Sequence, residues 1–526
     1  MSENIYSIGE RAVASHSLIA SYMSLKVMEN GGNAVDAAIT ASLLLNVLEP
    51  GWSGLGGGGF VLLYSEDYGF KALDYREVAP QKVRIEDYNS EEDISIGYKA
   101  VAVPGTLRGL WMLHQEFGEI EWSKIVDITI KYAESCRVSR LLNRCMGRDL
   151  DRAIYKLKMC PESYNTFLKD GEIYPEGSTI SYRKFAQTLN MLREGIESFY
   201  QGEIAEEIDK TFSINVGYLS LKDLSTYRAI WREPIIHELE IGDKILKFAT
   251  MPPPSSGILV IEALNILSQM NLKDKKEDYY QKLAYTLFHI IDERCSIISD
   301  PSFNDEDFSR LLSENHLKES LDSIEKGKMS YHLVGDSGGT SHISIVDGKG
   351  RMCVSLTETI ECFMGSGITV KGILLNDEMH DFTLQRDHPN SIAPGKRPAS
   401  SMSPLIILDK DESPMIVIGA SGGMRILSSL VQTLSNYFIR RRDPVSSILE
   451  GRIHVRGDRV VLEDLLKDKI SNNALLRAGL KMDEVRELSM YPGTDIYFGA
   501  VQAVFKKDNL FLAVSDPRKQ SGAYAK

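Results

Sequence analysis

The sequence predicts an α+β protein in which a helix-rich N-terminal part is followed by a sheet-rich C-terminal part. Between residues 104 and 300, apolar residues recur mainly at helical spacing, with few runs typical of strands. After residue 340 the pattern changes to short alternating or apolar runs bounded by glycine and proline. We find no internal repeat.

The first part of the chain is predicted to contain two helices and then a hairpin. The break Gly31-Gly32-Asn33 separates the helices, and Glu49-Pro50 ends the second. The glycine run of residues 54–59 lacks the Lys-Ser/Thr ending of a phosphate-binding loop and precedes a strand, so it indicates tight backbone packing. The predicted helices are Leu18–Met28 and Ala34–Leu48, and the predicted strands are Phe60–Tyr64 and Lys71–Tyr75.

Two polar segments precede the sheet-rich part. Lys273–Asp278 is predicted to be a solvated turn, and residues 299–339 a surface loop or linker that ends in Gly335-Asp336-Ser337-Gly338-Gly339. A long helix, Met424–Arg442, is expected after the strands. The predicted strands are Ser341–Val346, Met352–Leu356, Gly372–Leu375, Leu405–Leu408 and Met415–Ile418.

Composition limits the class of protein. With 526 residues, 43% of them hydrophobic and 25% charged, the chain resembles an ordinary globular protein. A net charge of −13 disfavours binding to nucleic acid or to anionic lipid. The N-terminus does not resemble a secretory signal and no apolar run is long enough to span a bilayer, so we expect a cytoplasmic protein. The six cysteines form no CxxC pair, which indicates a reducing compartment and no zinc cluster, and no HExxH occurs, so no zinc hydrolase is indicated.

Thr340 is the most informative position, because a glycine-rich segment leads directly into a strand that starts with this threonine. A hydroxyl needs a base to become a nucleophile, and the α-amino group of an N-terminal threonine supplies one with a pKa near neutrality. Such an N-terminus requires cleavage of the Gly339–Thr340 bond by attack of the hydroxyl on the preceding carbonyl. A threonine that starts a strand after a glycine turn is also common without any such role.

Thr359 and the pair Gly422-Gly423 are the candidates to assist Thr340. Thr359 lies on the next predicted strand, where a cross-strand neighbour would place its hydroxyl near Thr340. Two successive glycine N–H groups at the start of a helix form a good site for an oxyanion. Ordinary strand packing and an ordinary strand-to-helix turn explain the same residues equally well.

Charged and hydroxyl side chains suggest a site for a small zwitterion. Glu378 and Asp381, three residues apart, could bind an ammonium group. Ser400-Ser401 beside a proline turn and the guanidinium of Arg76 could bind a carboxylate. Each of these residues could instead be a solvated loop residue or part of a surface ion pair.

Several short sequence motifs are distributed along nearly the whole chain. Taken together and in this order, they resemble those of the γ-glutamyltransferases (γ-glutamyl transpeptidases), a family of N-terminal-nucleophile hydrolases. The resemblance implies a four-layer αββα sandwich. The motifs are Gly31-Gly32-Asn33-Ala34-Val35-Asp36-Ala37-Ala38, Glu49-Pro50, Asp74-Tyr75-Arg76-Glu77, Ala102-Val103-Pro104-Gly105-Thr106, Thr340-Ser341-His342-Ile343-Ser344, Gly372-Ile373-Leu374-Leu375-Asn376, residues 396–404 and Ser515-Asp516-Pro517-Arg518.

The resemblance implies that Thr340 cuts the chain before itself and then acts as the nucleophile. Residues 1–339 and 340–526 would form a large and a small chain of one fold, alone or as a homodimer. The substrate would be a glutathione-like γ-glutamyl compound, and water or an amine would accept the γ-glutamyl group. No metal or organic cofactor is implied. The implied roles are nucleophile support by Thr359, oxyanion binding by Gly422 and Gly423, carboxylate binding by Arg76, Ser400 and Ser401, and amino-group binding by Glu378 and Asp381.

The chain departs from the family pattern at four places. Ser341 replaces a frequent second threonine, His380 replaces a usual aspartate, and the stretch between Asp381 and Ser400 is too short for a full lid. Glu361 replaces a usual asparagine, and this third carboxylate leaves surplus negative charge unless it is protonated or paired elsewhere. The alternatives are therefore an acylase or γ-polyglutamate-processing enzyme, or an uncut, inactive relative that binds a ligand.

Overall fold

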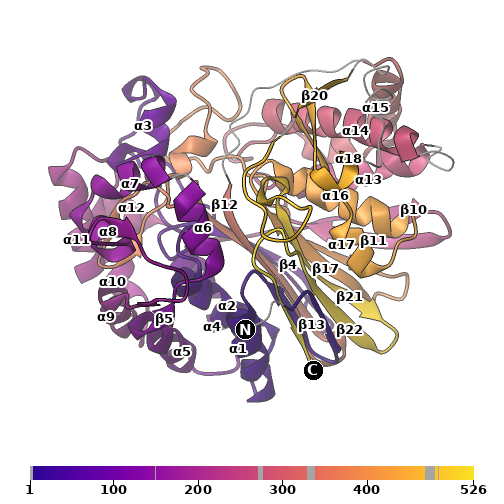
Figure 1. The fold of residues 1–526 in the computed structure, drawn as a ribbon. Helices are drawn as coiled ribbons and strands as arrows, with labels where there is room; N and C mark the ends of the chain where they lie inside the picture. The colour runs from indigo at the N-terminus through magenta and orange to yellow at the C-terminus, as the bar shows by residue number, and fades with distance from the viewer. Residues whose placement is uncertain (1–3, 149, 271–275, 328–337, 468–479, 484) are drawn as a thin grey trace.

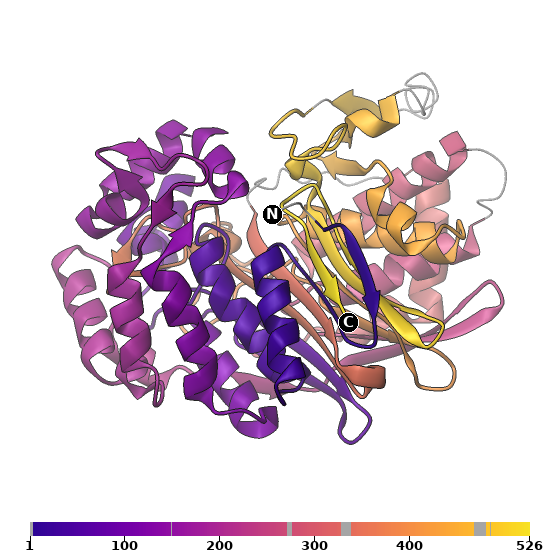
Figure 2. The same cartoon turned by 60° about the horizontal axis from the view of Figure 1, so that its bottom comes forward.

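Two antiparallel seven-stranded sheets, packed face to face with helices on both outer sides, form the centre of the molecule (Figures 1 and 2). The computed structural model describes residues 4–148, 150–270, 276–327, 338–467, 480–483 and 485–526. The first sheet has the strand order β23-β2-β12-β13-β3-β4-β9, and the second β1-β22-β21-β17-β16-β11-β10. This arrangement confirms the expected four-layer αββα sandwich.

Each sheet combines strands from both sides of residue 340. The strands of the first sheet are β23 (Gly522–Ala525), β2 (Ala12–Ser15), β12 (Gly339–Val346), β13 (Met352–Glu361), β3 (Gly58–Ser65), β4 (Gly69–Asp74) and β9 (Ile230–Arg232). Those of the second are β1 (Tyr6–Gly9), β22 (Leu510–Ser515), β21 (Ala500–Lys507), β17 (Pro414–Ser421), β16 (Leu405–Leu408), β11 (Lys244–Thr250) and β10 (Ile235–Ile241). The sheets are therefore interleaved in sequence.

Alternation of side chains along β3 explains the layers. Val61 and Leu63 belong to the core under the first helical layer, whereas Phe60, Leu62 and Tyr64 belong to the core shared with the second sheet. Because successive side chains of a strand point to opposite faces, an apolar strand with both faces covered is buried throughout. All eight residues of β3 are buried.

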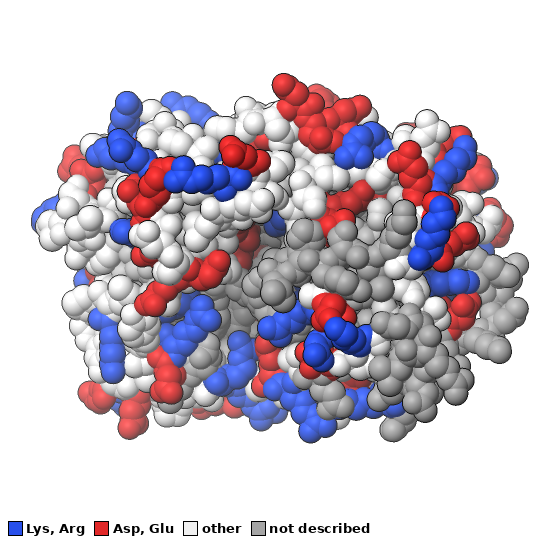
Figure 3. All heavy atoms as spheres, turned by 90° about the horizontal axis from the view of Figure 1, so that it is seen from above, with Lys and Arg blue, Asp and Glu red and all other residues white. Residues whose placement is uncertain are grey.

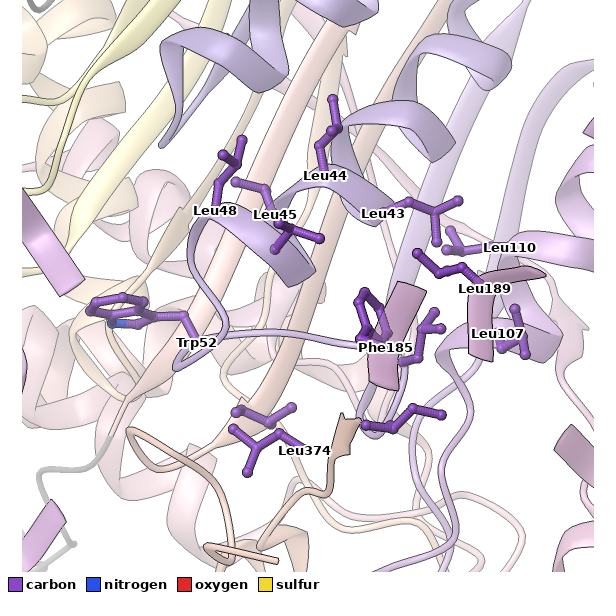
Figure 4. Close-up of a cluster of buried hydrophobic side chains, with 14 of the residues drawn as sticks. Leu43, Leu44, Leu45, Leu48, Trp52, Leu107, Leu110, Phe185, Leu189 and Leu374 are labelled. Carbon is purple, nitrogen blue, oxygen red and sulfur yellow. The ribbon is translucent and has the colours of Figure 1, made fainter. Parts of the chain in front are cut away.

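Helix α2 (Ala34–Leu48) is the centre of the first helical layer, and all of its residues are buried. Asn33 caps it and forms a capping box with Asp36. Figure 4 shows leucines of α2 beside side chains of α4 (Thr106–Phe117), α9 (Arg183–Met191) and β15 (Ile373–Leu374). Other helices of this layer and its surroundings are α1 (Leu18–Glu29), α3 (Glu91–Ser95), α4 (Thr106–Phe117), α5 (Trp122–Glu134), α6 (Arg140–Arg148), α7 (Leu150–Lys158), α8 (Pro161–Phe167), α9 (Arg183–Met191), α10 (Glu197–Tyr200), α11 (Glu203–Ile214) and α12 (Leu221–Thr226).

The second helical layer covers the outer face of the second sheet with three long helices and smaller elements (Figure 1). The helices are α13 (Gly257–Gln269), α14 (Lys276–Ser296), α15 (Glu314–Glu325), α16 (Arg425–Phe438), α17 (Pro444–Leu449) and α18 (Asp464–Lys467). The strands outside the two main sheets are β5 (Cys136–Arg137), β6 (Leu168–Lys169), β7 (Glu172–Ile173), β8 (Thr179–Ile180), β14 (Thr369–Val370), β15 (Ile373–Leu374), β18 (Ile453–Arg456), β19 (Arg459–Leu462) and β20 (Lys481–Asp483).

The loop prediction for residues 299–339 was wrong, and several other predictions were incomplete. The stretch predicted to be mainly helical contains β9, β10 and β11, and the predicted loop of residues 299–339 contains α15. The strand predicted at Gly372–Leu375 is β15, which pairs only with β14 and lies outside both main sheets. In the predicted turn Lys273–Asp278, residues 276–278 belong to α14 and residues 273–275 lie outside the described residues. Residues 335–337 also lie outside them.

Charges of both signs are interspersed over the described part of the face seen in Figure 3. This distribution differs from the continuous basic surface that nucleic acid requires. Among the described residues, no helix is long and apolar enough to cross a membrane. The six cysteines are free thiols, and Cys295 alone among them is half-buried while the others are buried.

Candidate active site

The pairing of the start of β12 with the end of β13 brings Thr340 and Thr359 together. In the pairing of β12 with β13, Thr340 lies opposite Thr359 and Gly339 opposite Glu361, as expected for cross-strand neighbours. The Thr359 hydroxyl donates to the carbonyl oxygen of Gly339 at 2.7 Å, and the Glu361 N–H donates to the Thr359 hydroxyl oxygen at 2.7 Å. The second bond fixes the hydroxyl so that its proton is directed to the carbonyl before Thr340.

The backbone around the Gly339–Thr340 bond is irregular and tightly packed. A bulge lies between Gly339 and Thr340, and Glu361 has φ +69°, a conformation that glycine and asparagine adopt more easily than glutamate. A Cβ atom on Gly338 would lie 2.6 Å from the backbone of Gly422 and Gly423. Only glycine therefore fits at residue 338, and strain of this kind is common at functional sites.

Gly422 and Gly423 join β17 to α16, with φ +129° and +57°. Their backbone lies against Gly338, close to the start of β12. The N–H groups of these two glycines lie just before the N-terminus of α16, where the helix dipole is positive, so they suit an oxyanion. Residues far apart in sequence thus meet at one point.

An open pocket surrounds Thr340. Seven residues predicted to act in catalysis or substrate binding line it: Thr340, Thr359, Glu361, Asp381, Ser400, Ser401 and Gly423. Its wall also contains Arg294, Cys295, Ser296, His380, His388, Asn390 and Met424. Arg76, Glu378 and Gly422 lie behind this wall and do not line it. The Ser401 hydroxyl contacts the sulfur of Met424 at 3.0 Å, and Ser400 Oγ accepts from the N–H of Met402 at 3.2 Å.

Arg76 forms a buried ion network with the residues predicted to bind an amino group. Its guanidinium is fully buried and contacts the carboxylates of Glu378 and Asp381, and its Nη1 donates to Glu77 Oε2 at 3.0 Å. Burial raises the pKa of Glu77 to about 7 and raises the pKa of Glu378, and Arg76 opposes both effects. Carboxylate oxygens of Glu361, Glu378 and Asp381 lie within 4.8 Å of one another.

Glu361 and His380, two departures from the family pattern, form a pair. His380 Nδ1 lies 3.6 Å from Glu361 Oε1. Burial lowers the pKa of His380, but Cys362 and Glu361 outweigh burial and raise it to about 12. Burial raises the pKa of Glu361. The extra carboxylate predicted to leave surplus negative charge therefore has a histidine beside it, nineteen positions later in the sequence.

Two site residues were missed in the sequence. Arg294 of α14 lines the pocket and donates from Nη2 to the Ala399 carbonyl at 3.0 Å, and its buried Nε has no hydrogen-bond partner among the described residues. Lys519 donates from Nζ to the Thr340 carbonyl at 2.9 Å, and burial lowers its pKa to about 8. Arg294 belongs to no recognisable sequence motif. Lys519 directly follows the motif Ser515-Asp516-Pro517-Arg518, and this position is what could have indicated a role for it.

An αββα sandwich with a threonine at the head of an inner strand defines the class of N-terminal-nucleophile hydrolases. The family model for gamma-glutamyltranspeptidase matches residues 20–526. The chain belongs to the γ-glutamyltranspeptidase family. It is 33% identical over 486 residues to the glutathione hydrolase proenzyme of Bacillus subtilis subsp. natto, covering 84% of this chain and 80% of that protein. It is 32% identical to the Escherichia coli (strain K12) glutathione hydrolase proenzyme, covering 81% and 77%.

Solved structures agree with this assignment. The Helicobacter pylori gamma-glutamyltranspeptidase is 28% identical and superposes with a TM-score of 0.54 over 59% of this chain and 90% of that one. The cephalosporin acylase from Bacillus halodurans superposes with a TM-score of 0.86 over 100% of this chain and 98% of that one, at 24% identity. At that identity the second likeness speaks for the fold alone.

Proposed function

We propose that the protein is a γ-glutamyltransferase or glutathione hydrolase that cuts its own chain between Gly339 and Thr340. The observation that carries the proposal is the hydrogen bond from the Thr359 hydroxyl to the Gly339 carbonyl, the carbonyl that Thr340 must attack. A donor already placed on this oxygen polarises the carbonyl and stabilises the negative charge that develops on it. Membership in the γ-glutamyltranspeptidase family supports the same conclusion.

In the cutting step, Thr340 Oγ1 forms a bond to the Gly339 carbonyl carbon, and the C–N bond to the Thr340 nitrogen then breaks. The hydroxyl proton goes to that nitrogen, which leaves as an amine. The resulting ester between Gly339 and the Thr340 side chain is hydrolysed by water. Residues 1–339 then end in a carboxylate, and residues 340–526 begin with a free α-amino group on Thr340.

In the catalytic step, the α-amino group of Thr340 accepts the proton of its own hydroxyl, and Oγ1 attacks the γ-carbonyl of the substrate. The N–H groups of Gly422 and Gly423 stabilise the oxyanion. The amine leaves with the proton, and a γ-glutamyl ester remains on Thr340 until water or an acceptor amine resolves it. In this proposal Thr359 orients the nucleophile.

The proposed γ-glutamyl binding mode uses both ends of the amino acid. Ser400, Ser401 and Arg76 hold the α-carboxylate, and the converging carboxylates of Glu361, Glu378 and Asp381 hold the α-amino group. The closeness of these three carboxylates supports this part of the proposal. Arg76 reaches a substrate only if its ion pairs with Glu378 and Asp381 rearrange, because its guanidinium is fully buried.

Intact-mass measurement tests the cutting step. We expect the purified protein to separate under denaturing conditions into chains of residues 1–339 and 340–526, whereas Thr340→Ala stays a single chain. N-terminal sequencing of the smaller chain should begin with Thr340. A parent protein that remains uncut after long incubation would instead support the inactive, ligand-binding relative.

A second candidate, an acylase for amides without an α-amino group, is favoured by one observation. The carboxylates that would bind the amino group are already paired in this structure, Glu378 and Asp381 with Arg76 and Glu361 with His380. A glutaryl chain would not need them. Turnover of γ-glutamyl-p-nitroanilide and glutaryl-p-nitroanilide, which differ only in that amino group, separates the two candidates. Preference for the glutaryl amide would overturn the γ-glutamyl assignment while leaving the cutting step intact.

A further inference from the structure

A compact group of two glutamates and two histidines lies within the second helical layer, outside the pocket. Glu262 belongs to α13, His289 and Glu293 to α14, and His316 to α15. His316 Nε2 lies 3.0 Å from both Glu262 Oε1 and Glu293 Oε1, and His289 Nε2 lies 3.1 and 3.8 Å from the same two oxygens. Three helices therefore direct four metal-ligating atoms to one point.

Two features of this group go beyond an ordinary ion-pair cluster. The four nitrogen–oxygen distances, 3.0, 3.0, 3.1 and 3.8 Å, are close to the edge of a tetrahedron around a zinc ion, about 3.3 Å for metal–ligand bonds of about 2.0 Å. The second carboxylate oxygens, Oε2 of Glu262 and Glu293, are buried and accept no hydrogen bond from an N–H group or hydroxyl of the described residues. The two glutamates are only 2% and 6% exposed, and an unpartnered buried carboxylate oxygen is costly unless a cation satisfies it.

We propose that Glu262, His289, Glu293 and His316 bind one divalent transition-metal ion, with Zn²⁺ as the preferred ion. Two carboxylates balance the charge of the ion, and imidazole and carboxylate are common zinc ligands. Four protein ligands close the coordination sphere, which is typical of a structural site and leaves no open position for substrate. HxxxE spacing on α14 places His289 and Glu293 on one face of the helix.

The site connects the helical layer to the pocket through α14. Glu293 precedes Arg294, Cys295 and Ser296, and these three residues line the pocket beside Ser400 and Ser401. A metal that joins α14 to α13 and α15 fixes the end of α14 and hence the position of Arg294. The proposal does not rest on the proposed function, because metal content and metal-dependent stability can be measured in Thr340→Ala, which neither cuts itself nor turns over substrate.

The test uses the full chain, free of any histidine tag, and Zn²⁺ alone as the probe. By elemental analysis after dialysis, we expect one zinc ion per 526 residues, whether or not the chain is cut. We also expect the thermal unfolding midpoint to rise when zinc is added to protein from which metal has been removed. Glu262→Gln and His316→Asn should each weaken zinc binding at least about 100-fold and abolish the rise. The matched controls Glu314→Gln, on the exposed face of α15, and His237→Asn, in β10, should bind like the parent.

Three outcomes would overturn the proposal. They are less than one tightly held zinc in the parent, unchanged zinc binding in both cluster variants, and a parent midpoint that zinc does not raise. If a cluster variant fails to fold, the visible absorption spectrum of Co²⁺ bound to the parent protein tests the proposal instead. The intense visible absorption of four-coordinate cobalt supports the site, and the weak absorption of six-coordinate cobalt contradicts it.

Discussion

At the scale of single residues, Thr359 is the side chain whose contacts say most about the proposed cutting step. Its hydroxyl oxygen accepts a hydrogen bond from the Glu361 N–H, and its hydroxyl donates one to the Gly339 carbonyl oxygen. The oxygen it polarises is therefore selected by the register of β12 and β13, since Thr359 lies opposite Thr340. One hydroxyl of fixed direction replaces the mobile donor that water would provide.

Thr359→Val removes the hydroxyl and keeps the shape of the side chain. We expect the cutting of the chain to slow about 100-fold, because loss of one oxyanion donor costs about 10²–10³ in rate. A time course of intact mass from the uncut protein measures the effect. Thr359→Ser, which keeps the hydroxyl, is the matched control and should cut at close to the parental rate. Equal rates for the valine variant and the parent would remove Thr359 from the cutting step.

His342, two residues after Thr340, makes stability sensitive to acid. It is fully buried between the sheets, where Nδ1 contacts Thr357 Oγ1 at 2.6 Å and Nε2 contacts Ser344 Oγ at 3.0 Å. Burial lowers its pKa to about 3 from an ordinary value of 6.5. Between these pH values the unfolded chain binds a proton that the folded chain does not, so stability falls as pH falls from 6.5 towards 3.

His342→Gln should reduce this loss. Between pH 7.5 and pH 5, the free energy of unfolding of the parent should fall by about 2 kcal/mol more than that of the variant. The figure follows because each pH unit below 6.5 lowers the free energy of unfolding by about 1.36 kcal/mol as long as His342 stays neutral in the folded protein. Urea unfolding of both proteins in a Thr340→Ala background, where the chain stays uncut, provides the measurement. Parallel pH profiles for the two proteins would contradict the assignment of a neutral His342.

At the scale of elements, α2 is the helix on which the first layer depends most. Every one of its residues is buried, and Leu44 lies in the core under the first sheet. Leu44→Ala should lower the free energy of unfolding by about 2–5 kcal/mol, because it opens a cavity in a closely packed core. Denaturant unfolding in the Thr340→Ala background measures it. Leu510→Ala, at a partly exposed leucine of β22, is the control and should cost under about 1 kcal/mol.

Local patterns predicted some elements and failed at others for a physical reason. The strands β12, β13, β16 and β17 were predicted because short apolar runs between turn residues are characteristic of strands. In β10, polar His237, Glu238 and Glu240 interrupt the apolar residues because the strand lies at a sheet edge, and its pattern was lost within a helix-rich stretch. Helix α15 was missed because it lies on the surface and is mostly polar.

The site was predictable where partners follow one another in sequence. Thr340 and Thr359 lie on neighbouring strands, so their contact followed from the order of strands. The ion pairs of Arg76 with Glu378 and Asp381 join residues about three hundred positions apart, and no local pattern predicts that a guanidinium and its carboxylates neutralise each other. The same holds for the group formed by α13, α14 and α15, whose ligands share no sequence motif.

At the scale of the whole molecule, the position of the proposed cut determines what happens to the two parts. β12 is central in the first sheet, paired on one side with β2 and on the other with β13, which itself pairs with β3. Both sheets mix strands that precede and follow residue 340. Separating the parts would break pairings in both sheets and expose the apolar core between them.

We therefore expect the cut protein to behave as one particle. Size-exclusion chromatography coupled to light scattering should give the mass of residues 1–339 plus 340–526, or a multiple of it, and only denaturant should separate them. Dissociation in native buffer at micromolar concentration would contradict this expectation. Thr340→Ala serves as the uncut reference and should elute at the same volume.

The pairing of β2 with β23 has a practical consequence. Arg11 and Lys526 exchange backbone hydrogen bonds, and Asn4 bridges to Gly522, so Lys526 lies about 13 Å, or four strand residues, from Asn4. A linker of about five residues can join Lys526 to Asn4. A circularly permuted gene could then begin at codon 340 and end at codon 339, so that loss of the initiator methionine alone would give Thr340 its free amino group. In that rewired protein maturation and turnover are uncoupled, and Thr359→Val would report on turnover alone.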